Sequence, residues 1–155
     1  MYASESLKSR LLRYAVNITP VFRATGAWIT HISSDVRLVK LKLPLKLKTK
    51  NPMGTMCGGN MYSAVHGIYL VMLARQLGEE YVCLDRFSTI KFLRPGKSAL
   101  FTEFELTQAE IDEVRSLVGQ DGKAERQYLV ELKDRDGAIC CEITCTVHVR
   151  KKRPG

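Results

Sequence analysis

Apolar and polar residues alternate along the chain between residues 37 and 49. Apolar side chains occupy every second position from Val39 to Leu47, and lysines fill most of the positions between them. A period of two places the apolar side chains on one buried face of a β-strand. Pro44 favours a sheet edge or a bulge, because proline cannot donate to a strand ladder. We therefore interpret the lysine row as protection of an edge rather than as a binding surface.

Two segments have helical spacing instead. Residues 5–16 place four apolar side chains on one face of a short amphipathic helix that we expect to pack on the domain and to end at Pro20: Leu7, Leu11, Leu12 and Ala15. From Gly58 to Leu77, apolar residues cover nearly every side of a helix, and Gly78 is a natural stop. A helix that is apolar almost all round must be covered by other elements.

The remaining pattern predicts five further strands and one helical connector. The strands span residues 27–32, 81–93, 98–106, 127–133 and 138–150, the connector spans 109–118, and hairpin-type turns are expected at 94–96 and 134–137. One buried helix with six strands indicates an α+β fold, an antiparallel sheet curled around that helix. We expect a single domain over 1–155, with 1–18 as a helical extension and 150–155 as a basic tail.

Composition narrows the class of protein. The 155 residues are 45% hydrophobic and 26% charged, which is typical of a globular domain. The longest apolar stretch is far shorter than the ~20 residues of a membrane span, and the start has no signal-peptide pattern, so we expect a cytoplasmic protein without a membrane partner. The five cysteines form no metal-spaced or disulfide-like pattern, so we expect no metal and no redox cofactor.

The segment before the predicted helix carries the most specific motif. From Asn51 it reads Asn-Pro-Met-Gly-Thr-Met-Cys-Gly-Gly-Asn-Met-Tyr. This resembles the hotdog-fold acyl-CoA thioesterases, in particular the phenylacetyl-CoA-type branch, whose signature is Asn-x-x-Gly-x-x-His-Gly-Gly followed by a helix Asp. It is more similar still to an uncharacterised branch with a Leu-Gly-x-x-Tyr segment, as at residues 77–81. Here Cys57 replaces the signature His, and His66 replaces the helix Asp.

The resemblance implies a hotdog fold, an acyl-CoA substrate with coenzyme A as part of it, and a homodimer or a homotetramer built as a dimer of dimers. At the start of the helix, the backbone N–H groups of Gly58 and Gly59 can stabilise an oxyanion. Their alternative role is a tight turn into the helix. His66 follows Gly59 by about two helical turns and can take a proton from water as a general base. Its alternative is a hydrogen-bonded core histidine.

Other residues of the motif have weaker claims. Asn51 either orients water or the substrate carbonyl, or starts an Asn-Pro turn. Cys57, beside a helix N-terminus, is either a nucleophile or a packing residue. Asp85 either serves the site or a subunit interface, or forms an ion pair within the sheet. We expect the substrate slot to be lined by Cys57, Asn60, Tyr62, Ser63 and Asp85.

These observations leave three hypotheses open. The first is a thioester hydrolase, and the second is a module that binds an acyl group or acyl-CoA without turnover. The third is a polyanion-binding protein, suggested by the net charge of +8. No aromatic residues interleave with the lysine row, so we expect no specific nucleic-acid partner. The basic residues instead fit a role in attracting the phosphates of coenzyme A.

Overall fold

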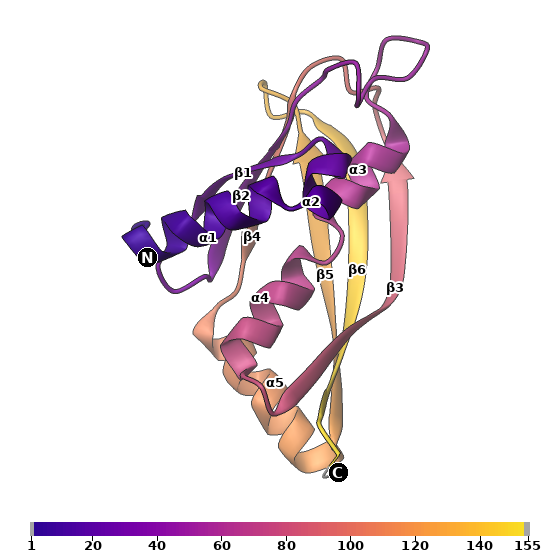
Figure 1. The fold of residues 1–155 in the computed structure, drawn as a ribbon. Helices are drawn as coiled ribbons and strands as arrows, with labels where there is room; N and C mark the ends of the chain where they lie inside the picture. The colour runs from indigo at the N-terminus through magenta and orange to yellow at the C-terminus, as the bar shows by residue number, and fades with distance from the viewer. Residues whose placement is uncertain (1, 154–155) are drawn as a thin grey trace.

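The computed structural model describes residues 2–153 and contains one six-stranded antiparallel sheet. Its strand order is β1-β2-β4-β5-β6-β3, which leaves β1 and β3 at the two edges (Figure 1). The strands are β1 (Trp28–Ile32), β2 (Leu38–Leu43), β3 (Tyr81–Phe92), β4 (Leu100–Glu105), β5 (Lys123–Lys133) and β6 (Ile139–Lys151). The α+β class and the six predicted strands are confirmed.

Five helices pack with the sheet. They are α1 (Leu7–Ile18), α2 (Pro20–Thr25), α3 (Gly58–Val65), α4 (Ile68–Leu77) and α5 (Gln108–Asp121). α3 and α4 lie within the curve of the sheet, and α1 and α2 lie beside β1 (Figure 1). Residues such as Ala64 and Leu73 are fully buried against Leu41, Phe104 and Ile143 of the strands. None of these helices is long and apolar enough to cross a membrane within the described residues.

The central helix is broken, and the prediction of one uninterrupted helix over residues 58–77 is wrong. α3 ends at His66, where ψ is 132°, and α4 starts after Gly67, whose φ is +80°. Glycine adopts this left-handed conformation readily, and a residue in this conformation interrupts a right-handed α-helix. The apolar pattern continues through the break because both helices face the same core. His66 therefore lies where the helix is interrupted rather than in the middle of a helix.

The lysine-rich strand is also shorter than predicted. β2 ends at Leu43, just before Pro44, and Leu47 is 90% exposed. Proline cannot donate to the ladder, so the strand ends there although the alternation of apolar and polar residues continues to Leu47. β2 pairs with both β1 and β4, so the interpretation as edge protection is wrong. Lys40 instead forms an ion pair with Glu103 on β4, at 2.7 Å.

The N-terminal helix buries only part of the expected apolar face. Leu12 and Val16 of α1 contact the core, whereas Leu7 and Leu11 are exposed. Asn17 fixes this orientation, because its buried side chain accepts from the N–H of Ile29 at 2.8 Å and donates to the same residue's carbonyl at 2.9 Å. Leu7 and Leu11 are exposed because the hydrogen bonds of Asn17, rather than the apolar stripe, determine which face of α1 packs on the sheet.

The two predicted turns have different outcomes. Residues 134–137 form the β5–β6 hairpin, closed by the Asp134 N–H bonding to the Ala138 carbonyl at 3.0 Å. Residues 94–96 do not form a hairpin, because β3 pairs with β6 while β4 pairs with β2 and β5. The predicted hairpin turn at residues 94–96 is therefore wrong, because strand partners cannot be inferred from local turn residues.

Candidate functional site

His66 and Asp85 form a polar pair at the break of the central helix. The Nε2 atom of His66 lies 3.2 Å from an Oδ atom of Asp85 on β3. The pairing register of β3 with β6 shifts between Asp85 and Phe87, and this bulge sets the position of the carboxylate. The ring of Tyr62, one turn earlier on α3, lies 5.3 Å from the imidazole. The His66 side chain remains 45% exposed, so a substrate or water can reach it.

This pair has the geometry of an oriented base. A carboxylate that holds one imidazole nitrogen fixes the ring and stabilises the imidazolium that forms when the other nitrogen takes a proton. Asp85 thus pairs with a helix residue rather than within the sheet, where its neighbour Arg86 pairs with Glu125 at 2.6 Å. Both residues are candidates from the sequence, but the contact between them, 19 positions apart, is visible only in the structure.

Gly58 and Gly59 lie at the other end of α3. Within residues 2–153 neither backbone N–H has a protein acceptor, and Cys57 supplies no side-chain cap. Both groups are therefore available to an anion. Gly58 also makes a close contact: a Cβ atom placed on it would lie 2.7 Å from the Phe92 ring. Gly58 borders a hollow of about 390 Å³ that Asn51 and Arg94 also line.

The two ends of α3 are separated by the length of the helix. Seven residues from Gly59 to His66 correspond to about 10 Å along the axis. The oxyanion donors and the base of one chain therefore do not meet at one substrate carbonyl. The expected helix spacing is present, but the structure brings His66 together with Tyr62, Ser63 and Asp85, and not with the glycines.

Three polar residues of the motif are used to build the loop and its attachment. The Asn51 side chain accepts from the N–H groups of Met53 and Thr55 and donates to the Thr55 hydroxyl. The Asn60 amide donates to the Thr25 carbonyl at 2.8 Å and ties α3 to α2. Cys57 is the half-buried N-cap residue of α3. These contacts match the turn and packing roles described for Asn51 and Cys57 above.

Tyr62, Ser63 and His66 share a hollow of about 450 Å³ with α2. Its remaining wall comes from α2 and the residue before it, including Phe22. His66 and Phe22 also line a second, mostly apolar cavity that extends beneath α1. Phe22 could not be predicted as a site residue, because a single aromatic residue in a short helix has no distinguishing spacing.

Burial makes most of the cysteines poor nucleophiles. Burial raises the pKa of Cys83 and that of Cys141 to about 11, and it also raises the pKa of Cys140 and of Cys145. The reactive form of cysteine is the thiolate, which these environments disfavour. All five cysteines are free. Within residues 2–153, no three His, Cys, Asp or Glu side chains gather as metal ligands.

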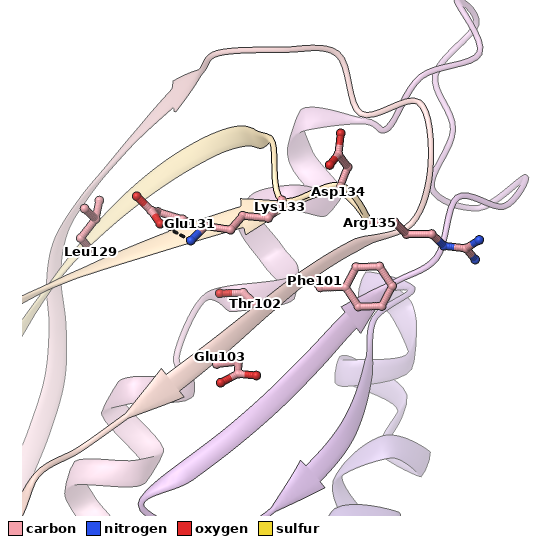
Figure 2. Close-up of a pocket in the computed structure, with 9 residues that line it drawn as sticks. Phe101, Thr102, Glu103, Leu129, Glu131, Lys133, Asp134 and Arg135 are labelled. Carbon is pink, nitrogen blue, oxygen red and sulfur yellow. Dashed lines mark ion pairs between the residues drawn. The ribbon is translucent and has the colours of Figure 1, made fainter.

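A larger hollow lies on the outer face of the sheet, where β4 and β5 separate (Figure 2). It has a volume of about 590 Å³ and is lined by charged side chains that include Glu103, Glu131 and Lys133. Glu131 and Lys133 pair with each other at 2.7 Å. Beside this separation, the Tyr69 hydroxyl of α4 accepts from the Glu105 N–H at 3.3 Å. This hollow contains no histidine or cysteine, so it is a weaker candidate for hydrolysis.

Comparison with known proteins places the chain in a family and a fold. The model of a family described as a domain of unknown function, DUF4442, matches residues 8–149. Among solved structures, a Pseudomonas aeruginosa protein of unknown function described as a probable thioesterase is similar with a TM-score of 0.81 at 19% identity, covering 98% of this chain and 100% of its own. A thioesterase from Haemophilus influenzae is similar with a TM-score of 0.68 at 15% identity, covering 97% and 96%.

A third similar structure is a mutant thioesterase from Pseudomonas aeruginosa, with a TM-score of 0.70 at 13% identity, covering 98% of this chain and 100% of its own. Comparison with curated proteins gives no match. The structural similarities establish the hotdog fold that the sequence motif implied. The assignment to the phenylacetyl-CoA-type branch stays a prediction.

Proposed function

This chain belongs to the DUF4442 family, and we propose that it hydrolyses the thioester bond of an acyl-CoA. The observation that carries the proposal is the His66–Asp85 pair, at 3.2 Å, in a break of the central helix that opens onto an apolar cavity. A thioesterase needs a base for water beside a slot for an acyl group. The similar thioesterases of the same fold support this choice of reaction.

In the proposed reaction, His66 acts on water and Asp85 positions His66. The water oxygen attacks the thioester carbonyl carbon while its proton passes to the imidazole. The tetrahedral intermediate then collapses, the carbon–sulfur bond breaks, and the imidazolium returns the proton to the departing sulfur. The products are a carboxylic acid and free coenzyme A. None of these steps calls on a cofactor.

The oxyanion donors fit this reaction if two copies of the chain pair through β3. β3 is a long edge strand with exposed Leu84 and Phe87, and such an edge is a template for another strand. Within one chain, Gly58 contacts Phe92 while His66 contacts Asp85, so α3 runs beside β3 in the opposite direction. Antiparallel pairing of two β3 strands about a twofold axis directs the His66 end of each chain toward the glycine end of the other.

Light scattering at micromolar protein tests this pairing. We expect a dimer, or a dimer of dimers, and therefore at least twice the chain mass of 17.5 kDa. Leu84→Arg and Phe87→Arg together should shift the mass toward that of one chain, because charged residues disfavour edge pairing. A monomer in the unsubstituted protein would remove the dimer from the proposal.

Binding without turnover is the second candidate function. It is favoured by the separation of Gly59 from His66 within one chain, and by the engagement of the Asn51 and Asn60 side chains in local structure. A protein of this kind would hold an acyl-CoA and release no free thiol. Release of thiol from acyl-CoA, followed by a colorimetric thiol reagent, separates the two functions.

His66→Ala is the decisive test of the hydrolase. We expect kcat to fall by roughly 10²-fold or more, which is the usual contribution of a general base. His31→Ala on β1 is the matched control, and it should leave kcat unchanged. Melting temperatures of both variants separate loss of catalysis from loss of folding. An unchanged kcat in His66→Ala would withdraw the catalytic role.

A further inference from the structure

An apolar cavity of about 230 Å³ lies between the N-terminal helix, the first two strands and α4. Its walls are mostly aliphatic and come from α1, β1, β2 and α4: Leu12, Val16, Ile29, Val39, Ile68 and Met72. His66 lies at one end, where it also borders the hollow beside α2. Arg75, two turns along α4, lies at the other end. The cavity therefore runs along α4 from the imidazole.

The backbone on both sides of this cavity departs from regular structure. Gly67 interrupts the central helix with φ +80°, directly beside His66. Val36, whose side chain lines the cavity, has φ +57°, which is a strained conformation for a β-branched residue. A turn holds Val36 in place through its N–H to the Ser33 carbonyl, and Gln76 of α4 donates to the neighbouring Asp35 carbonyl at 2.6 Å. The fold therefore maintains a strained backbone at this wall.

We propose that this cavity binds the hydrocarbon chain of a straight, medium-length acyl group. The inference rests on the proposed function, because it places the thioester carbonyl at His66. An apolar cavity of about 150 Å³ accommodates six carbon atoms as benzene, so about 230 Å³ corresponds to roughly nine. From Ile68 to Arg75, α4 advances seven helical residues, about 10 Å. An extended hydrocarbon chain covers about 1.2 Å per bond, so about eight bonds, which join nine carbons, span this length.

Both measures indicate an acyl chain of about eight to ten carbons. The His66 end is polar and open, which suits the thioester and the coenzyme A beyond it. The aliphatic walls suit methylene groups and offer them no hydrogen-bond partner. Arg75 is exposed, so the stem of its side chain can cover the methyl end of the chain while its guanidinium stays in water.

Chain-length selectivity is the first test. We expect kcat/KM measured on linear saturated acyl-CoA substrates to be highest at eight to ten carbons and at least tenfold lower at four and at sixteen. Val16→Phe narrows the cavity from α1 and should lower kcat/KM for decanoyl-CoA at least tenfold while that for butanoyl-CoA changes less than threefold. Ile18→Phe, on the exposed face of the same helix, is the matched control and should change neither.

Binding of free decanoate, measured by isothermal titration calorimetry, separates this inference from the proposed reaction. We expect decanoate to bind the unsubstituted protein and Ile18→Phe, and to bind Val16→Phe at least tenfold more weakly. Val71→Trp, which narrows the cavity from α4, provides a second variant if Val16→Phe does not fold. If decanoate binds but no thiol is released from acyl-CoA, the cavity assignment is supported and the proposed hydrolase activity is contradicted. A flat chain-length profile, or decanoate binding that neither variant weakens, would overturn the cavity assignment.

Discussion

Both ends of α3 carry candidate residues in the sequence, yet the structure surrounds them differently. At its start, Gly58 lies against the Phe92 ring and the neighbouring loop is held by the Asn51 side chain. At its end, His66 meets a carboxylate, an adjacent hollow and an apolar cavity. The Gly58 end is therefore determined largely by backbone hydrogen bonds and packing, whereas the His66 end presents a polar pair at an open surface.

This difference shows why spacing along a helix is weak evidence for a shared site. Residues two turns apart lie on one face but about 10 Å apart, which is too far for both to contact one carbonyl. A second chain must supply the missing group, or the two ends have separate roles. Substitutions made at each end separately distinguish these two possibilities.

The largest effect is expected at the open end. Asp85→Asn should lower kcat by about 10²-fold, or about 2.7 kcal/mol, because the neutral amide no longer stabilises the imidazolium. The value of KM should change little, since Asp85 acts through His66. Steady-state kinetics on an acyl-CoA substrate measure both constants.

Two further variants make this prediction specific. Asp85→Glu retains the charge and should recover part of the lost kcat, which a purely structural role would not predict. Asp136→Asn, in the exposed β5–β6 turn, is the matched control and should behave as the unsubstituted protein. Equal kcat values for Asp85→Asn and Asp136→Asn would show that the pair at 3.2 Å has no part in the reaction.

The same contrast separates the features that could be predicted from the sequence from those that could not. Strand period and apolar patterning were sufficient for the α+β class, because both are local properties, and the resemblance of the Gly58–Gly59 motif to a known family implied the hotdog fold. The break at Gly67 was not predicted, since an apolar face continues through it. The His66–Asp85 contact and the cavity beneath α1 depend on tertiary packing, which cannot be predicted from the spacing of residues along the chain.

A second prediction concerns the packed end. Gly58→Ala should reduce the free energy of unfolding by about 1 kcal/mol, because its Cβ would lie 2.7 Å from the Phe92 ring and this exposed ring must turn away. Chemical denaturation measures the change. Adding Phe92→Ala should remove most of the penalty, so a double-mutant cycle with no coupling would contradict the contact.

A third prediction concerns α1, which covers the cavity beside His66. Glu5 accepts from Arg13 at 2.8 and 3.1 Å and from the Ile32 N–H, and the Arg13 bonds hold the pKa of Glu5 below its ordinary value. A carboxyl with a lowered pKa stabilises the fold above its unfolded pKa of about 4.3, and this is lost as pH falls through the folded pKa. Glu5→Gln should therefore cost about 1 kcal/mol at pH 7 and progressively less in acid.

Denaturation curves across this pH range check the prediction. Glu103→Gln is the matched control, because it removes an exposed ion pair with Lys40 and should cost less than about 0.5 kcal/mol at every pH. A Glu5→Gln penalty that persists undiminished in acid would show that the side chain acts by shape rather than by charge.

The smallest effect on stability is expected at Gly59, and it bears directly on the role of the glycine pair. A Cβ atom there would meet only the Cys57 sulfur, at an ordinary 3.9 Å, and its φ is compatible with alanine. Gly59→Ala should therefore raise the free energy of unfolding by about 0.5 kcal/mol, through reduced freedom of the unfolded chain. If the N–H of Gly59 serves a substrate oxyanion, the added methyl group hinders its approach, and we expect kcat/KM to fall about threefold, or about 0.6 kcal/mol. A gain in stability with unchanged kcat/KM would assign the glycines to the turn alone, and the oxyanion donors would then have to be sought among other backbone N–H groups near His66.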